Sequence, residues 1–330
     1  MSSSSAATST PAVAAAPPLT VPDAPSLLRD ALALTKPGIT RLVVITAGVG
    51  FALAAMSRTW RPLDLLVAAG FCALGTALTS SGANALNQVA ERVADARMPR
   101  TRNRPIPAGR MSPRMGIVLA LGASALGLAS LVIVVNVASA IAAAATIALY
   151  IAVYTPSKKV TIFSTVIGAV PGALPTMLGW AAASQGSGVS AFSDPGAWAL
   201  FLVLFSWQMP HFLAIAWMHR DGYACAGFRV LSVGDRSGRS TAWICFICTF
   251  ALVASTLVAP VAIGAVSGWI AAPAAIALGA LMLRSAWRFV RERSRERARS
   301  LFLLSITHLP LFMVALVVDA VATRVFFTGS

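Results

Sequence analysis

The sequence has few charged residues, and acidic residues are the rarest of them. Its 330 residues include 11 Asp and Glu against 26 Lys and Arg, and charged residues make up 11% of the chain. Hydrophobic residues make up 57%. Because a soluble domain carries about 25% charged residues, this composition excludes a soluble globular protein and predicts an integral membrane protein of the helical type.

Cysteine is also scarce. The four cysteines, Cys72, Cys225, Cys245 and Cys248, lie in or beside apolar runs, so we expect no disulfide framework. Cys245 and Cys248 form a CxxC inside an apolar run, without a second pair or a nearby histidine. We interpret this pair as core packing rather than a metal or redox site.

The first 26 residues almost lack charge and aromatic side chains. They are mainly Ser, Ala and Pro, so they cannot bury enough apolar surface to fold, and we expect a disordered tail over residues 1–26. This tail has neither the basic start and apolar core of a signal peptide nor the arginines of a mitochondrial transit peptide. We therefore take a bacterial membrane as the default location, and residues 27–330 as one transmembrane domain.

The rest of the chain consists mainly of apolar segments. Each is close in length to the roughly 20 residues that a helix needs to cross a bilayer. Two longer charge-free runs must each fold back as a hairpin, one near Asn136 and the other near Gly264–Gly268. We predict an all-α bundle of about nine transmembrane helices, at Ile39–Ala55, Leu63–Val89, Met115–Val135, Ala138–Tyr154, Thr161–Ala183, Trp198–Met218, Thr241–Val261, Trp269–Arg288 and Leu301–Ala322.

The basic residues are distributed asymmetrically about these segments. With the amino terminus inside, every Lys and Arg falls in an inside segment except Arg58, Arg61 and Arg324. Cytoplasmic loops carry such an excess of basic residues, so we expect the amino terminus inside and the carboxyl terminus outside. The same rule accounts for the net charge of +15 without nucleic acid as a partner.

Two of the rare acidic residues share one face of a predicted helix that follows the second apolar segment. Asn87, Glu91 and Asp95 are four residues apart, so a helix places them on one face, about 6 Å apart along its axis. Three oxygen ligands in a row suit a hard cation such as Mg²⁺, which leaves its other positions to water and phosphate.

Arginines follow this acidic face directly. The side chains of Arg97, Arg100, Arg102 and Arg104 match phosphate oxygens in shape and charge. Acids and arginines together predict a metal–diphosphate site at the membrane surface. The alternative for the arginines alone is a solvated loop that obeys the positive-inside rule, and their pattern leaves both open.

A second inside loop, YTPSKKVT at residues 154–161, contains two lysines. Lys158 and Lys159 either anchor the next helix at the membrane surface or contact phosphate. The pattern itself favours neither function.

The sixth apolar segment contains polar residues within the membrane. Trp207, Gln208 and His211 lie in a helix that Pro210 would kink, and polar groups at this depth usually line a cavity or pair with each other. His211 is therefore either a substrate contact or a satisfied core histidine. Asp221, in the loop that follows, would face the acidic residues as a second acidic site if the second and sixth helices are neighbours.

Six motifs cover the chain from about Leu34 to Leu311. They are LTKPGITRL at 34–42, NALNQVAERVADARMPRTRNRP at 84–105, YTPSKK at 154–159, GAVPGALPTMLGW at 168–180, WQMPHF at 207–212 and LFLLSITHLPL at 301–311. This set resembles the protohaem IX farnesyltransferases (haem O synthases), a branch of the UbiA-type intramembrane prenyltransferases. The arginine loop, residues 97–111, and WQMPHF are the most specific parts of the set.

The resemblance implies a UbiA-type bundle of nine helices around a central cavity with a polar cap on the cytoplasmic side. It implies that Asn87, Glu91 and Asp95 hold Mg²⁺ on the diphosphate of farnesyl diphosphate, with Asp221 as a further catalytic acid. It also implies a set of substrate-binding residues, namely Arg100, Arg104, Tyr154, Lys158, Lys159, Trp207 and His211.

The reaction implied by the resemblance transfers a farnesyl group to a vinyl group of protohaem IX, with a hydroxyl added from water. The products would be haem O and diphosphate, on the route to haem A for terminal oxidases, so haem b would be a substrate rather than a cofactor. The implied partners are farnesyl diphosphate, protohaem IX, the lipid bilayer, and haem A synthase or oxidase assembly proteins.

Three positions depart from the family pattern. Gly222 separates Asp221 from Tyr223, Ser164 stands where an asparagine is common, and Thr176 follows Pro175 where a second proline is usual. Two alternative functions remain open. The first is a quinone-pathway aromatic prenyltransferase, which would have a more acidic second motif. The second, from a different class, is a transporter or haem-handling assembly factor, and a transporter would carry ionisable residues near the membrane midplane.

Overall fold

The computed structural model describes residues 27–184 and 186–326, so the predicted tail over residues 1–26 lies outside the described residues. Helices make up the fold, and the described part contains no strand. The long helices are α2 (Pro37–Met56), α3 (Pro62–Arg97), α4 (Pro113–Ser130), α5 (Val137–Ala148), α7 (Ser164–Ala182), α8 (Pro195–Met218), α11 (Arg239–Ile263), α12 (Ala271–Arg291) and α13 (Arg295–Phe326).

Short elements connect the long ones. They are α1 (Leu27–Leu34), α6 (Thr155–Val160), α9 (Arg220–Cys225), α10 (Leu231–Gly234), the π-helical turns η1 (Leu131–Val135) and η2 (Leu149–Tyr154), and the 3₁₀ turn η3 (Val189–Ser193). The first hairpin turns at Asn136, as predicted. Its side chain accepts a hydrogen bond from the Ser139 N–H and so caps α5, while the second turn contains Gly264 and Gly268 at positive φ.

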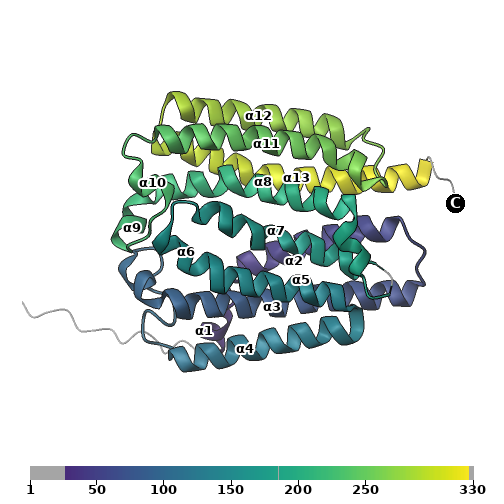
Figure 1. Cartoon of the computed structure of the whole chain (residues 1–330), viewed down its shortest axis with the longest axis horizontal. Helices are drawn as coiled ribbons and strands as arrows, with labels where there is room; N and C mark the ends of the chain where they lie inside the picture. Colours follow the sequence, from purple (N-terminus) through teal and green to yellow (C-terminus); the bar gives the residue numbers. More distant parts are fainter. Residues whose placement is uncertain (1–26, 185, 327–330) are drawn as a thin grey trace, which may run out of the picture.

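The helices lie roughly side by side, so the bundle has two ends (Figure 1). One end, which we call the cap end, carries the start of α2, the last turns of α3, and α6, α9 and α10. At the opposite, far end, Arg324 near the end of α13 donates to the carbonyl oxygen of Met56 at 3.4 Å. The chain thus enters α2 at the cap end and leaves α13 at the far end, which requires an odd number of crossings.

Eight of the described helices are long and apolar enough to cross a membrane. Helix α12 is not among these eight, and its last turn is basic, with Arg288 and Arg291. It nevertheless packs between α11 and α13, and it runs from the far end to the cap end, where α13 begins (Figure 1). In the described part of the chain, nine helices therefore connect the two ends of an all-α bundle, which confirms the predicted fold class.

Small residues let the helices approach closely. A side chain at Gly179 of α7 would meet the carbonyl oxygen of Ala47 on α2, and one at Gly50 of α2 would meet the carbonyl oxygen of Thr176. Membrane helices commonly associate through such small residues, because van der Waals packing replaces the hydrophobic effect there. This contact fixes α2 against α7, and with it the position of Lys36 at the start of α2.

One buried carboxylate holds the far end together. Asp319 of α13 is 0% exposed, and its Oδ1 accepts hydrogen bonds from the N–H and hydroxyl of Ser267 at 3.1 and 2.6 Å. Its Oδ2 accepts from the N–H groups of Ile270 and Ala271, both at 2.8 Å. Asp319 thus caps α12 from a neighbouring helix and joins the α11–α12 turn to α13.

We expect Asp319→Ala to lower the Tm of the detergent-solubilised protein, because several buried donors lose their acceptor at once. The expected loss is about 3 kcal/mol, in line with hydrogen bonds to charged groups. Asp64→Ala is the matched control, since Asp64 is an exposed carboxylate at the start of α3, also at the far end. Equal Tm changes in the two variants would contradict this capping function.

Candidate diphosphate site

The predicted acidic face lies at the cap end of α3. This helix has 36 residues and is therefore about 54 Å long, whereas a bilayer core is about 30 Å thick. Asn87, Glu91 and Asp95 occupy successive turns in its final third, and they are only 1%, 6% and 3% exposed. We call these three residues the ladder.

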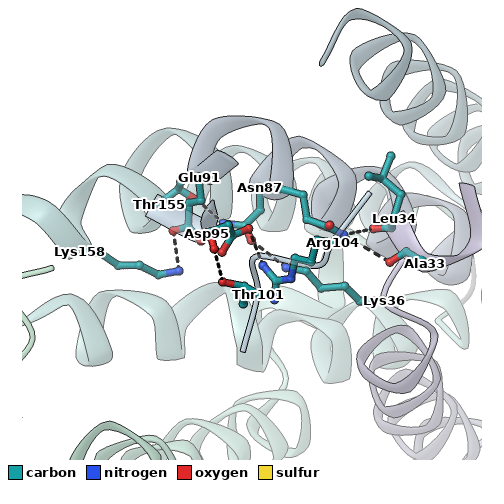
Figure 2. Close-up of polar contacts among 11 residues, drawn as sticks. Ala33, Leu34, Lys36, Asn87, Glu91, Asp95, Thr101, Arg104, Thr155 and Lys158 are labelled. Carbon is teal, nitrogen blue, oxygen red and sulfur yellow. Dashed lines mark hydrogen bonds and ion pairs between the residues drawn. The ribbon is translucent and has the colours of Figure 1, made fainter. Parts of the chain in front are cut away.

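Each member of the ladder pairs with a cation from a different segment (Figure 2). Lys158 Nζ lies 2.7 Å from Glu91 Oε1, and Arg104 Nη1 lies 2.7 Å from Asp95 Oδ2. Lys36 Nζ donates to Asn87 Oδ1 at 2.8 Å. Three segments far apart in the sequence thus meet on one face of α3, as buried acids require, because an unpaired buried carboxylate is very costly.

Lys36 is a residue that sequence reasoning did not assign to the site, although it lies in the LTKPGITRL motif. It is the only non-glycine residue with positive φ in the described part of the chain, at 50°. Burial, together with the charges of Arg104 and Lys158, lowers the pKa of Lys36 to about 7. A strained backbone that carries a half-buried cation is typical of a functional position.

Lys158 is enclosed by aromatic rings and by a loop from the other half of the bundle. Its Nζ lies 4.5 Å from the ring centre of Tyr154 and 5.8 Å from that of Phe228. The N–H of Arg229 donates to the carbonyl oxygen of Lys158 at 2.6 Å. The loop after α9 therefore reaches the ladder through Phe228 and Arg229.

Two more contacts hold the deep end of the ladder. Asn87 Nδ2 donates to Thr155 Oγ1 at 3.1 Å, and Thr155 Oγ1 donates to the carbonyl oxygen of Tyr150 at 2.8 Å. Tyr150 lies within the π-helical turn η2 and Thr155 directly follows it, and π-helical turns often occur at functional sites. This turn places Tyr154, Thr155 and Lys158 against α3.

Three of the predicted charged site residues, Asp221, Arg100 and Lys159, are not paired with the ladder. The Asp221 side chain is 98% exposed, and its ion-pair partner is Arg220 at 3.8 Å. Asp221 stands in the first turn of the short α9, and α3 packs mainly on α2, α4 and α5 rather than on α8. The structure thus does not place Asp221 as the second acidic site facing the ladder, and its catalytic function stays a prediction.

Arg100 and Lys159 are also exposed. Burial, together with the charges of Arg100 and Arg295, lowers the pKa of His219, so Arg100 lies near the end of α8. Lys159 is exposed, whereas its neighbour Lys158 is bound to the ladder. Adjacent residues of a helix face different directions. The structure therefore distinguishes the lysine that binds the ladder, Lys158, from the exposed Lys159, which the sequence pattern could not do.

Trp207 and His211 lie together at the contact of α8 and α13. Their rings are stacked with centroids 4.6 Å apart, Trp207 Nε1 donates to the carbonyl oxygen of Ser305, and His211 Nδ1 lies 2.7 Å from Ser305 Oγ. Because the Ser305 hydroxyl gives its proton to the carbonyl oxygen of Phe302, we assign the proton to His211 Nδ1. His211 Nε2 then keeps its lone pair for another group.

The ladder suits a metal ion that is held jointly with phosphate. In the described part of the chain, no group of three or more His, Cys, Asp and Glu side chains could hold a metal ion alone. The ladder offers two carboxylates and one amide oxygen, and Mg²⁺ usually takes one or two carboxylates and completes its shell with water and phosphate oxygens. The donor set therefore fits Mg²⁺ bound together with a diphosphate.

Comparison with known proteins agrees with this geometry. The model of the UbiA prenyltransferase family matches residues 43–314. The chain belongs to this family. Two relatives, each named Protoheme IX farnesyltransferase, are 38% identical over 88% of this chain (Solibacter usitatus) and 40% identical over 91% of it (Opitutus terrae), and the matches cover 99% and 97% of those proteins. The chain is thus a membrane-embedded prenyltransferase.

Solved structures share the fold. A structure described as digeranylgeranylglyceryl phosphate synthase matches 89% of this chain and 98% of its own, with a TM-score of 0.71 and 14% identity. A UbiA homologue from Archaeoglobus fulgidus bound to GPP and Mg²⁺ matches 87% of this chain and 99% of its own, with a TM-score of 0.51 and 13% identity. At such identities the likeness concerns the fold alone.

We expect Lys158→Ala to weaken the binding of inorganic diphosphate in the presence of Mg²⁺ about tenfold or more, since a half-buried cation on the ladder is lost. Lys159→Ala should change binding less than about twofold, because an exposed lysine contributes little. Isothermal titration calorimetry of the solubilised protein measures both. Equal losses of diphosphate affinity in the two variants would instead support the interpretation that Lys158 only anchors the helix at the membrane surface.

Proposed function

We propose that this prenyltransferase transfers the farnesyl group of farnesyl diphosphate to a vinyl group of protohaem IX. Water supplies a hydroxyl group, and the products are haem O and diphosphate. The observation that carries this proposal is the ladder with its three cations, in a chain whose relatives of nearly equal length are named Protoheme IX farnesyltransferase.

The ladder cations would bind the diphosphate. Lys36, Lys158 and Arg104 each come within hydrogen-bond distance of the α3 face, so a diphosphate placed along that face would lie within reach of all three. Mg²⁺, when bound by Asn87, Glu91 and Asp95, would supply further positive charge to the leaving group. Positive charge arranged in advance lowers the barrier to breaking the bond between the farnesyl carbon and the diphosphate oxygen.

The acceptor would meet the farnesyl group from the α8–α13 side. Trp207 and His211 present a stacked aromatic pair there, which suits a flat porphyrin or an unsaturated prenyl chain. The vinyl carbon forms the new bond to the farnesyl group, and water then gives its oxygen to the neighbouring carbon and releases one proton. Arg100, exposed at the cap end, is proposed as a later contact of the diphosphate, and Asp221, also exposed there, as a contact only through a bound Mg²⁺.

We propose the bacterial inner membrane as the location, with the cap end on the cytoplasmic side. The support is the placement of basic residues, since Arg58, Arg61 and Arg324 alone stand at the far side of the predicted topology. Haem O would then pass to haem A synthase or to oxidase assembly proteins.

The deciding assay gives purified protein Mg²⁺, farnesyl diphosphate and protohaem, and separates the porphyrin products by mass. We expect a haem that has gained a farnesyl group and one water. Prenylation of 4-hydroxybenzoate with unchanged haem would instead support the quinone-pathway alternative, and haem binding without reaction would support a haem-handling protein.

We expect Glu91→Ala and Asp95→Ala each to lower turnover at least about a hundredfold, because each removes an oxygen ligand and leaves a cation unpaired. Both proteins should still insert into the membrane. Glu292→Gln is the control, since Glu292 belongs to an exposed ion pair with Arg297 between α12 and α13. Full Mg²⁺-dependent turnover in both alanine variants would overturn the assignment of the ladder.

A further inference from the structure

A fourth buried acid lies near the ladder and has no part in the mechanism above. Asp30 of α1 is 4% exposed, and both of its carboxylate oxygens accept from Arg110 Nε, at 3.1 and 3.3 Å. In a second contact, Arg110 Nη2 lies 3.1 Å from Asp30 Oδ1. A buried carboxylate engaged by two nitrogens of one guanidinium is a specific and geometrically demanding contact.

Arg110 connects this acid to the loop that carries Arg104. Its Nη2 also donates to the carbonyl oxygen of Asn103 at 3.1 Å, and Asn103 directly precedes Arg104. The loop folds on itself, since the N–H groups of Arg110 and Met111 both donate to the carbonyl oxygen of Pro105. Arg110 therefore braces the backbone from which Arg104 reaches Asp95.

The other side of the pair leads to Lys36. Asp30 and Lys36 are six positions apart. Between them the carbonyl oxygens of Leu34 and Thr35 accept from Gln88 and Asn84 of α3, at 2.7 and 3.3 Å. Residues 27–36 thus form a strap across the cap end of α3. Leu34 of the strap also packs with Ile106 and Met111 of the arginine loop in one small apolar cluster.

We infer that Asp30 and Arg110 are a positioning pair, which ties the strap to the arginine loop and so holds Lys36 and Arg104 over the ladder. Neither residue touches the ladder itself. The pair acts on the two cations from opposite sides, so its loss lets both move away from the diphosphate. This inference rests on the proposed function, since it concerns how the same site holds a prenyl diphosphate.

A purely structural pair would behave differently. It would lower stability and the fraction of active protein, while the affinity of each folded molecule for prenyl diphosphate stayed the same. A positioning pair raises Kd and KM for the prenyl diphosphate and leaves KM for the acceptor unchanged. The two functions therefore separate in binding measurements, even where both lower the Tm.

The test uses full-length protein in detergent with Mg²⁺ and the thiolo analogue of farnesyl diphosphate, which resists ionisation. Calorimetry should give a Kd about tenfold higher for Asp30→Asn and for Arg110→Gln, because displaced binding groups lose affinity steeply. The double variant with Asp30→Arg and Arg110→Asp should recover to within about threefold of the original protein, since the swapped pair can form again.

Asp319→Asn is the matched control, because it alters a buried carboxylate at the far end and should lower the Tm without changing Kd. Unchanged Kd values in both single variants, or a swap that restores the Tm but not Kd, would overturn the positioning function. If the original protein failed to bind the analogue, the proposed function and this inference would both fall. If the original protein binds the analogue and the single variants bind it with the same Kd, this inference alone is contradicted.

Discussion

The cap end depends on one constraint, which is that buried carboxylates must be compensated. Glu91 and Asp95 lie almost completely out of contact with solvent, and removing a partner from such a group costs several kcal/mol. Asp95 pairs with Arg104 of the arginine loop, and Glu91 pairs with Lys158 of α6. Asn87 accepts a hydrogen bond from Lys36 at the start of α2. Because the partners lie on three separate segments, satisfying α3 also fixes where those segments meet.

The same constraint determines the net charge of the site. Two carboxylates face Lys158, Arg104 and Lys36, so the cap carries a surplus of positive charge before anything binds when Lys36 is protonated. The lowered pKa of Lys36 reflects this crowding and the burial of the amine. An anionic group that approaches α3 relieves the repulsion among the cations, and it frees carboxylate oxygens for a divalent ion. Anion and metal therefore favour each other's binding at this face.

The long helices were predictable from the sequence because length and hydropathy decide them. The turn at Asn136 followed from the length of its charge-free run, and the acid spacing on α3 followed from the helical repeat. Helix α12 has a basic last turn, and by its hydropathy and charge it is not among the eight helices that could cross a membrane by themselves. The sequence nevertheless predicted this crossing, because the charge-free run before Arg284 is long enough for two helices.

The site was predictable where one helix carried it, and less so where distant segments met. Lys36 lies 51 residues from Asn87, and the positive-inside rule already explained its charge, so its place in the LTKPGITRL motif did not assign it to the site. The part of the strap before that motif, residues 27–33, contains one acid, Asp30, and no pattern that points to the site. Asp221 stays a prediction, because at the start of α9 its side chain faces solvent, although the loop after α9 reaches Lys158.

Under the proposed function, the direction of α3 also orders the two substrates in depth. The helix runs from the far end to the cap end, so Asn87 is the ladder residue nearest the membrane interior, and Asp95 is the outermost. A diphosphate along this face leaves its prenyl chain to pass Asn87, Lys36 and Thr155 into the apolar bundle. His211 and Trp207 lie about 10 and 16 Å from the end of α8, also toward the interior. On this proposal the reacting carbon of the prenyl chain lies between the polar cap and the aromatic pair, where it leaves the charges and meets an apolar acceptor.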